Sequence, residues 1–337
     1  MTSPQVSVVL PVYNGAAELA RAVDSILRQS FADFELIAIN DGSTDGSAAI
    51  LDALGDPRVR VIHQENRGLA ATLNRGIALA RGEYIARQDQ DDVALPPRFG
   101  RQVAFLKANP ACALVGTRAE IRVGDRGPER FHDHPLDDAA LRFELLFDNP
   151  FVHSSVMMRK SALEAVGVYS IDPARQPPED YELWSRLSRH YQVANLPERL
   201  TIYRETPGGM SRAPGRLFHE RAVLVSSENL ATAAGDAAPS RVHRDLAALS
   251  RQVFALVSRN PDFAGMRGVI ERAGARIHAG TPGSDVPMRV AARIDTLHWH
   301  YARHQGWRML GPLWPLAHFS WRRLRGGLRR LRGYVLL

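Results

Sequence analysis

Apolar stretches of strand length alternate with stretches of helical periodicity through about the first ninety residues. Val6–Val12 and residues 35–40 are nearly continuous apolar runs, which predicts strands that are covered on both faces. Between them, apolar residues recur at helical spacing, and Asn14 is expected to cap the helix that they predict. Residues 58–62 predict a third strand, and a helix then precedes the strand of residues 83–86; the apolar stripe of that helix contains Leu69, Leu73, Ile77 and Ala80.

This alternation predicts an α/β protein with a Rossmann-like nucleotide-binding domain and a mixed, mostly parallel central sheet. Successive strand–helix–strand units imply parallel strands joined by right-handed crossovers. The four predicted strands end at Tyr13, Asp41, His63 and Asp89, and the carboxyl ends of parallel strands meet at one edge of a sheet. Ligands of open α/β sheets bind at that edge, so the polar residues there suit a nucleotide pocket.

The middle of the chain continues this pattern with more turns. The predicted elements are, in order, a helix from residues 96–97 to about residue 109, a strand at 112–116, a polar hairpin or flap at 117–134, a helix at 137–147, a strand at 149–158 entered through His153, a turn at 176–180, a helix that carries Leu183 and Trp184, and strands at 191–195 and 200–204.

Strand signals disappear after about residue 215, and helical patterns remain at residues 216–231, 242–257 and 290–304. This change predicts three parts. They are an α/β domain at residues 1–215, a helical region at 216–304 and a basic amphipathic tail at 305–337.

The formal charge of +7 belongs to the tail rather than to the body of the chain. Eight arginines and no acidic residue follow Asp295, and removing those eight charges from +7 leaves −1. A near-neutral body argues against nucleic-acid binding. Cys112 is the single cysteine, so no disulfide forms within the chain, which suits a reducing cytosol. The first residues contain no basic or long apolar segment, so we expect no signal peptide.

Three carboxylates, Asp89, Asp91 and Asp92, follow the strand of residues 83–86. Residues two apart in an extended segment point to the same side, so Asp89 and Asp91 can share one hard divalent cation with phosphate oxygens. Acid clusters at strand ends are also typical of solvated turns. The cluster therefore needs support from the rest of the chain.

Six short stretches occur in a fixed order between residues 5 and about 210. They are residues 8–14 (Val-Val-Leu-Pro-Val-Tyr-Asn), 40–47 (Asn-Asp-Gly-Ser-Thr-Asp-Gly-Ser), 66–70 (Asn-Arg-Gly-Leu-Ala), 89–92 (Asp-Gln-Asp-Asp), 153–156 (His-Ser-Ser-Val) and 179–184 (Glu-Asp-Tyr-Glu-Leu-Trp). Each is a loose motif alone, but together they resemble the family-2 glycosyltransferases, which have the A-type nucleotide-sugar transferase fold. The resemblance implies that residues 1–215 form the catalytic domain.

The resemblance also implies a nucleotide-sugar site at the predicted sheet edge. In it, Asp41 accepts a hydrogen bond from the N3–H of uracil or thymine. Asp89 and Asp91 match the family's Asp-X-Asp motif, which holds Mg²⁺ or Mn²⁺ against the diphosphate. Asp91 is the preferred candidate for the metal ligand, because the first acid of the motif contacts ribose in many members. The other residues that the resemblance assigns to the nucleotide pocket are Pro11, Tyr13, Asn14, Asn66, Gly68, Leu69 and Gln90.

Asp180 is implied to be the general base of an inverting transfer, with Glu179 as the alternative. Inversion needs a carboxylate on the face opposite the leaving diphosphate, where it takes the proton of the acceptor hydroxyl. Asp180 can equally be a helix cap, and the two roles are compatible. His153 resembles a family residue near the diphosphate or acceptor. Arg204 and the loop that follows it are expected to clamp the phosphates.

Processive family members carry a Gln-X-X-Arg-Trp segment and transmembrane helices, and this sequence has neither. We therefore expect the transfer of one sugar per encounter, from a UDP- or TDP-sugar to a lipid-linked or polysaccharide acceptor of the cell surface. Two alternatives remain. One is a nucleotidyltransferase, although only one glycine and no lysine follow the first strand. The other is a nucleotide-sugar-binding scaffold without turnover.

The tail predicts a contact with an anionic membrane surface. Residues 307–321 are aromatic and apolar but contain Pro312 and Pro315, which leaves them too broken to span a bilayer. Apolar residues from Trp321 to Val335 then recur at helical spacing beside the arginines, as in helices that lie on anionic lipid. A partner-binding helix and a solvated basic end are the alternatives. We expect a cytoplasmic protein, peripheral at the inner face of the membrane.

Overall fold

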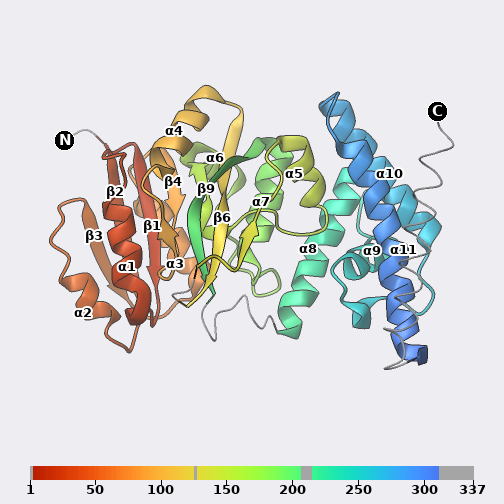
Figure 1. Cartoon of the computed structure of the whole chain (residues 1–337), viewed down its shortest axis with the longest axis horizontal. Helices are drawn as coiled ribbons and strands as arrows, with labels where there is room; N and C mark the ends of the chain where they lie inside the picture. Colours follow the sequence, from red (N-terminus) through yellow and green to blue (C-terminus); the bar gives the residue numbers. More distant parts are fainter. Residues whose placement is uncertain (1–2, 125–126, 206–214, 311–337) are drawn as a thin grey trace.

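The computed structural model describes residues 3–124, 127–205 and 215–310. Within these residues, nine strands form one sheet in the order β3-β2-β1-β4-β8-β6-β9-β5, and β7 pairs with β6 outside this path (Figure 1). The strands are β1 Val6–Val12, β2 Phe34–Asp41, β3 Val59–Gln64, β4 Tyr84–Arg87, β5 Val93–Ala94, β6 Cys112–Val123, β7 Arg130–His132, β8 Met157–Arg159 and β9 Gln192–Glu205.

Helices connect these strands and form the far end of the molecule. In chain order they are α1 Ala16–Leu27, α2 Ser47–Asp52, α3 Leu69–Leu79, α4 Arg98–Ala108, α5 Asp138–Glu144, α6 Lys160–Val166, α7 Glu179–His190, α8 Arg216–Ala234, α9 Arg241–Ser250, α10 Phe263–Gly280 and α11 Val286–Leu310, with 3₁₀ turns η1 at His153–Ser155 and η2 at Phe254–Leu256.

Strands β3, β2, β1 and β4 are parallel neighbours, with β1 between β2 and β4. Every residue of β1 and β2 is buried, as their continuous apolar runs predict. Beyond β4 the sheet is mixed, because β8 runs antiparallel to both β4 and β6 while β6 and β9 are parallel. The mixed, mostly parallel sheet and the shared edge of the first four strand ends are therefore confirmed.

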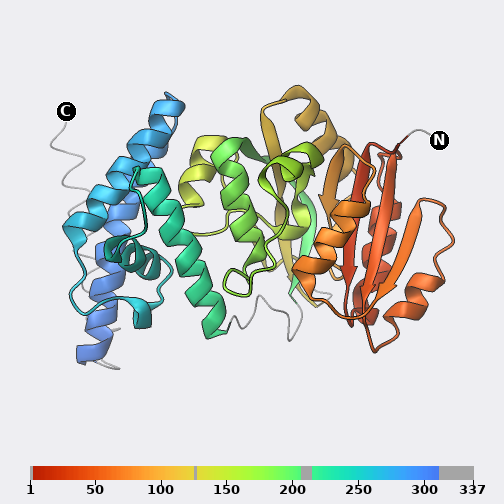
Figure 2. The ribbon, with the colours of Figure 1, turned by 180° about the vertical axis from the view of Figure 1, so that it is seen from behind.

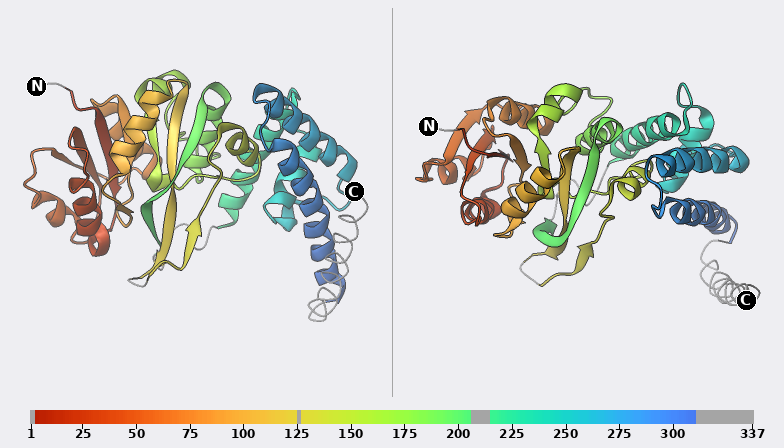
Figure 3. Two further views of the ribbon diagram at one scale, coloured as in Figure 1. Left: turned by 45° about the horizontal axis from the view of Figure 1, so that its top comes forward. Right: turned by 90° about the horizontal axis from the view of Figure 1, so that it is seen from above.

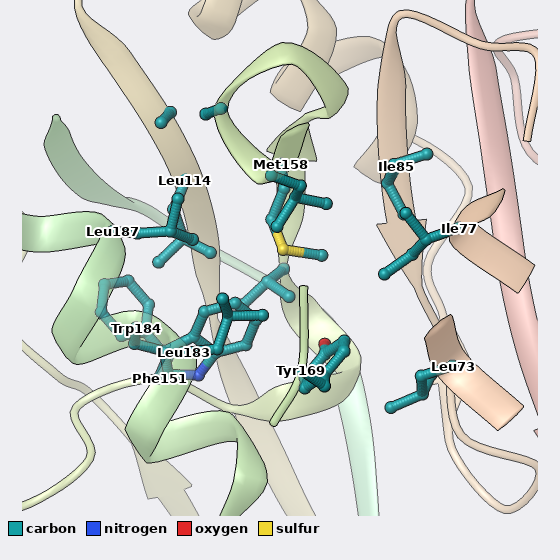
Figure 4. Packing of buried hydrophobic residues seen from close by; sticks show 14 of the residues in the cluster. Leu73, Ile77, Ile85, Leu114, Phe151, Met158, Tyr169, Leu183, Trp184 and Leu187 are labelled. Atoms are coloured by element: carbon teal, nitrogen blue, oxygen red, sulfur yellow. The ribbon is translucent and has the colours of Figure 1, made fainter. Parts of the chain in front are cut away.

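Two apolar layers cover the sheet. Alternate residues of β1 and β2 pack on α1, α2 and α4 on one face, and the opposite residues pack on α3, α6 and α7 on the other, which faces the viewer in Figure 2. Trp184 of α7 is fully buried in this second layer, beside Phe151 and Tyr169 (Figure 4). Its ring meets those of Phe151, Tyr169 and His153 edge-on, with centroids 5.8–6.4 Å apart. Removing such side chains from water is the main stabilising contribution to the fold.

A third core joins α5 to the C-terminal helices α8, α9, α10 and α11, at the end of the molecule opposite β3 (Figure 3). Hydrogen bonds tie α8 to the sheet domain. Asn229 Nδ2 donates to the Leu145 carbonyl over 2.9 Å and to Ser185 Oγ over 2.7 Å, and Ser226 Oγ donates to the Leu146 carbonyl over 2.6 Å. All of these groups are buried, so the helical region is joined to α5 and α7 by a polar seam.

Several predicted elements differ from the structure, among them the helix predicted at 242–257, which ends at Ser250 as α9 and is followed by the turn η2. Residues 149–158 are not one strand, because Asn149 Oδ1 accepts from the Phe151 N–H and His153–Ser155 then turns as η1, which leaves only Met157–Arg159 as β8. The two strands predicted at 191–195 and 200–204 are one strand, β9, whose pairing with β6 shifts register on either side of Pro197. Helix α10 was not predicted.

The predicted membrane-binding residues of the tail, from Trp321 to Val335, lie outside the described residues. Among the helices that the structure describes, none has both the length and the apolar character required to cross a bilayer. The limits at residues 215 and 305 stay predictions.

Candidate active site

The loops after β1 and β2 hold each other at the carboxyl edge of the sheet. Asn14 has a φ of 51°, and its Oδ1 accepts from the Thr44 N–H over 2.8 Å. Asp45 Oδ2 accepts from the N–H of Ala16, the first residue of α1, over 3.0 Å. The prediction that Asn14 caps α1 is therefore wrong, since a carboxylate from the neighbouring loop does so. Tyr13 projects from this edge with half of its surface exposed.

Asp41, the last residue of β2, is buried and organises the loop before α3. Its Oδ1 accepts from Gln64 Nε2 over 2.6 Å and from the Arg67 N–H over 2.8 Å, and its Oδ2 accepts from the Gly68 N–H over 3.0 Å. Gly68 has a φ of +82°, which disfavours any residue with a Cβ, and Asn66 Oδ1 also accepts from its N–H. A carboxylate offers about four lone-pair sites, so one acceptor site remains for a ligand.

Gln90 joins the acidic loop after β4 to the end of β1. Its Oε1 accepts from the Tyr13 N–H over 2.8 Å and its Nε2 donates to the Tyr13 carbonyl over 3.0 Å. Pro11 lies buried within β1, and Leu69 is the first residue of α3. The predicted nucleotide-pocket residues thus come from four neighbouring strand ends, those of β1, β2, β3 and β4.

Asp89, Asp91 and Asp92 lie together in the loop between β4 and β5. One carboxylate oxygen from each lies within 4.8 Å of the other two. Asp92 Oδ1 accepts from the Arg204 N–H over 2.8 Å, while its buried Oδ2 has no hydrogen-bond partner among the described residues. The sequence prediction did not include Asp92, although the run of three acids was the available signal.

Because the cluster is largely buried, its carboxylates destabilise the folded protein while they are ionised. Burial, and then the neighbouring Asp89 carboxylate, raise the pKa of Asp91 to about 6. The pKa of Asp92 is raised well above its usual value by burial and then by Asp89 and Asp91. A hard divalent cation takes oxygen ligands, and its charge offsets such repulsion. The unpartnered Asp92 oxygen and the crowded carboxylates therefore fit Mg²⁺ or Mn²⁺.

Arg87 and Ser154 support the acidic loop, and neither was predicted. Arg87 ends β4, is 2% exposed and forms an ion pair with Asp89. Its Nη1 donates to Ser154 Oγ over 3.1 Å, and Ser154 Oγ donates to Asp89 Oδ2 over 2.7 Å. A charged residue at the end of an apolar strand was the signal for Arg87.

The acidic pair Glu179 and Asp180 begins α7, where Glu179 is buried and Asp180 is half-buried. Asn149 Nδ2 donates to Asp180 Oδ2 over 2.7 Å, and Asp180 Oδ1 accepts from the Tyr181 N–H over 2.7 Å. Burial and then Asp180 raise the pKa of Glu179 to about 7, and burial raises that of Asp180. The Asp89 carboxylate also raises the pKa of both residues, so the pair and the acidic loop are coupled electrostatically. A carboxylate with a raised pKa suits a general base near neutral pH.

His153 and Arg204 make contacts within the protein. His153 Nε2 lies 2.9 Å from the Tyr169 hydroxyl, and burial and then Arg87 lower its pKa well below the usual value, so its ring is neutral. Arg204 Nε lies 3.3 Å from Glu18 Oε2. The loop expected to act with Arg204, at residues 206–211, lies outside the described residues. Contacts of both side chains with a ligand stay predictions.

The structure combines a mostly parallel sheet with the loop that Asp41 organises, the acidic loop and the acidic pair Glu179 and Asp180. This combination defines the A-type glycosyltransferase class. The TarS fragment 1–349 of S. aureus, solved with UDP-GlcNAc, has the same fold, with a TM-score of 0.57 at 18% identity over 88% of this chain and 87% of that fragment.

Sequence comparison gives the family. The family model of Glycosyl transferase family 2 matches residues 7–167. EpsE of Bacillus subtilis, assigned as a glycosyltransferase, is 34% identical over 231 residues, which are 66% of this chain and 81% of EpsE. The amylovoran biosynthesis glycosyltransferase AmsE of Erwinia amylovora is 32% identical over 200 residues, or 58% and 74% of the two chains. The chain belongs to glycosyl transferase family 2 and is a glycosyltransferase, which decides against the nucleotidyltransferase and the scaffold without turnover.

Proposed function

We propose that the protein transfers a single sugar from a UDP- or TDP-sugar to a lipid-linked or polysaccharide acceptor, with inversion at the anomeric carbon. The observation that carries this proposal is the arrangement of the Asp41 loop, the acidic loop and the Glu179–Asp180 pair around one sheet edge. The structure of TarS with UDP-GlcNAc supports a uridine donor. The name of AmsE, which refers to amylovoran biosynthesis, supports a polysaccharide acceptor.

The donor's nucleoside binds at the ends of β1 and β2. The free acceptor site of Asp41 takes the N3–H of the base, while its other bonds keep the segment from Asn66 to Leu69 in place. Tyr13 presents an exposed ring beside this position and packs on the base. The Gln90 bridge then fixes the distance between the nucleoside and the acidic loop.

Asp91 and Asp92 hold the divalent cation, and Asp89 faces the ribose and the cation from the start of the loop. Asp92 contributes its unpartnered Oδ2 and is fixed through Oδ1 by the backbone of Arg204. When bound, Mg²⁺ or Mn²⁺ supplies positive charge that stabilises the leaving nucleoside diphosphate. The loop's own contribution is to keep three carboxylates in one place before the ligand arrives, so that little reorganisation is required.

Asp180 acts as the base. The acceptor hydroxyl oxygen attacks the anomeric carbon, the bond from that carbon to the diphosphate oxygen breaks with its electron pair leaving on the diphosphate, and the hydroxyl proton moves to the Asp180 carboxylate. Asn149 orients the carboxylate, and burial keeps its proton affinity high enough for this step. Glu179, the preceding residue, titrates together with Asp180 and is the alternative base.

The donor site is tested by thermal unfolding with UDP, TDP, ADP or GDP, each with Mn²⁺ or with EDTA. A ligand at 100 times its Kd stabilises the folded state by about 2.7 kcal/mol. We expect a shift with UDP or TDP that needs Mn²⁺ and is absent in Asp91→Ala. Asp180→Asn should keep this shift and lose turnover. No shift with any nucleotide, or full turnover by Asp180→Asn, would contradict the proposal.

The basic tail docks the enzyme on anionic lipid, close to a lipid-linked acceptor. Support comes from the sequence pattern of Trp321 to Val335 and its arginines. Co-sedimentation with phosphatidylserine vesicles should be strong for the full chain and weak for Arg322→Gln/Arg323→Gln/Arg325→Gln, with phosphatidylcholine vesicles as the control. Equal binding of the two proteins to the anionic vesicles would remove the tail from the proposal.

A further inference from the structure

The Arg87 side chain is buried among groups of opposite charge at the centre of the site. It is 2% exposed, and its guanidinium forms an ion pair with Asp89 and donates to Ser154 Oγ. Its Nε has no hydrogen-bond partner among the described residues. Burying a guanidinium costs free energy unless charged partners offset the loss of water. The arrangement therefore indicates a use for Arg87 beyond stabilising the fold.

Ser154 adds three hydrogen bonds to the ion pair between Arg87 and Asp89. Its Oγ accepts from Arg87 Nη1 and from the Asp89 N–H, each over 3.1 Å, and donates to Asp89 Oδ2 over 2.7 Å. The hydroxyl is held in turn by the 3₁₀ turn η1. Backbone and side chain of Asp89 are thus both fixed, and Arg87 contacts Asp89 and Ser154 through the same Nη1, whose position a lysine ammonium does not reproduce.

The same guanidinium acts on the acidic pair at the start of α7. The pKa of Glu179 is raised mainly by burial and then by Asp180, that of Asp180 mainly by burial, and Arg87 opposes both increases while Asp89 adds to them. Asn149 Nδ2 donates to Asp180, and the two carboxylates add to the increase of the Tyr169 pKa that burial causes. Arg87 is a cation that lowers the pKa of both carboxyls of the pair.

We propose that Arg87 is a positioning residue for sugar transfer, which fixes the Asp89 end of the acidic loop through Ser154 and supplies the buried positive charge that favours an ionised base pair. The inference rests on the proposed function, because it assumes that the acidic loop binds the cation and that Asp180 or Glu179 is the base. Arg87 thereby connects the donor side and the acceptor side of the site.

Two conservative variants separate these two effects. Arg87→Lys and Ser154→Ala keep a positive charge but displace the donor Nη1 or remove the Ser154 bridge, so Mn²⁺ affinity in the presence of UDP should fall about tenfold or more, as for other groups that orient metal ligands. The readout is free Mn²⁺ measured by electron paramagnetic resonance. The titration midpoints of the Glu179 and Asp180 carboxyls, followed by ¹³C NMR without metal, should stay where they are in the wild type.

Arg87→Met removes the charge as well, so these carboxyl midpoints should rise by about one pH unit. The matched control is Arg159→Met. The Arg159 guanidinium is also largely buried and donates to the Cys112 carbonyl over 2.9 Å, but it lies at the opposite edge of the sheet, paired with Tyr84. That variant should lose stability and leave both readouts unchanged.

Unchanged midpoints in Arg87→Met, or unchanged Mn²⁺ affinity in both Arg87→Lys and Ser154→Ala, would overturn the inference. If Arg87→Met does not fold, the Mn²⁺ measurements on the two conservative variants decide. Failure of the proposed function is recognised separately, because wild-type protein would then bind no Mn²⁺ with UDP, while the carboxyl titration would still report on Arg87.

Discussion

Replacing Asp91 with asparagine should stabilise the metal-free protein. In the wild type at pH 8, the Asp91 carboxylate is ionised although partial burial, and then the neighbouring Asp89, raise its pKa from 3.8 to about 6. At ~1.4 kcal/mol per pH unit, this difference corresponds to about 3 kcal/mol of destabilisation above pH 6. Asparagine has nearly the same shape without the charge. We therefore expect Asp91→Asn in EDTA to gain about 2–3 kcal/mol, or on the order of 5 °C in Tm.

The sign of the pH dependence follows from the same pKa. Because the folded protein binds the Asp91 proton more tightly than the unfolded chain does, the destabilisation is complete above the folded pKa and disappears as the pH falls towards 3.8. The gap in Tm between Asp91→Asn and the wild type should thus be large at pH 8 and narrow at pH 5. With Mn²⁺ and UDP at pH 8 the order should reverse, since the wild type alone gains from binding the cation.

Differential scanning calorimetry in EDTA and in Mn²⁺ with UDP measures these differences. Asp24→Asn is the control, because Asp24 lies exposed on α1, paired with Arg28, and should move neither value. An Asp91→Asn protein that is less stable than the wild type in EDTA at pH 8 would refute the reasoning. So would a gap in Tm that does not change between pH 8 and pH 5.

Three further outcomes are expected. Asp41→Asn places an NH2 group against either the Arg67 or the Gly68 N–H, so it should lose about 2–3 kcal/mol in urea unfolding and weaken UDP binding; wild-type stability would contradict the assigned hydrogen bonds. The initial rate of transfer should fall as the pH drops through about 7, where Glu179 takes up a proton, and a flat profile from pH 8 to 5.5 would argue against this acidic pair as the base. Trp184→Ala should cost about 3–5 kcal/mol in chemical unfolding, and a loss below 1 kcal/mol would mean that the core around α7 repacks.

The parallel half of the sheet and the acidic residues at its edge could be predicted because their signals are local. Continuous apolar runs gave β1 and β2 within one or two residues of the observed bounds, and the strand ends brought Asp41 and the acidic loop to one edge as expected. The start of α7 was equally visible, since Glu179 follows two prolines. In each case a few adjacent residues determine the element.

The supporting contacts could not be predicted because they join residues far apart in the chain. Ser154 and Asp89 are separated by 65 positions, and neither neighbourhood indicates the other. Helix α10 was missed for a related reason: its glycines are typical of loops, yet a Cβ at Gly274 would lie 2.2 Å from Val290 Cγ2 of α11. That glycine permits a close helix contact, and the packing stabilises α10 despite its weak propensity.

The polar seam between α8 and the pair α5–α7 has a consequence for how members of this family diverge or are recombined. Asn229 bonds to Ser185 on the same helix that carries Asp180 at its start, so the C-terminal helices are anchored to the element that presents the base. A chimera that exchanges these helices between relatives must carry matching residues on α5 and α7, or it will lose the Asn229 bonds to Ser185 and to the Leu145 carbonyl, which then keeps only the Tyr181 hydroxyl as a donor. Exchanges of the C-terminal helices should therefore succeed in blocks that include both sides of the seam.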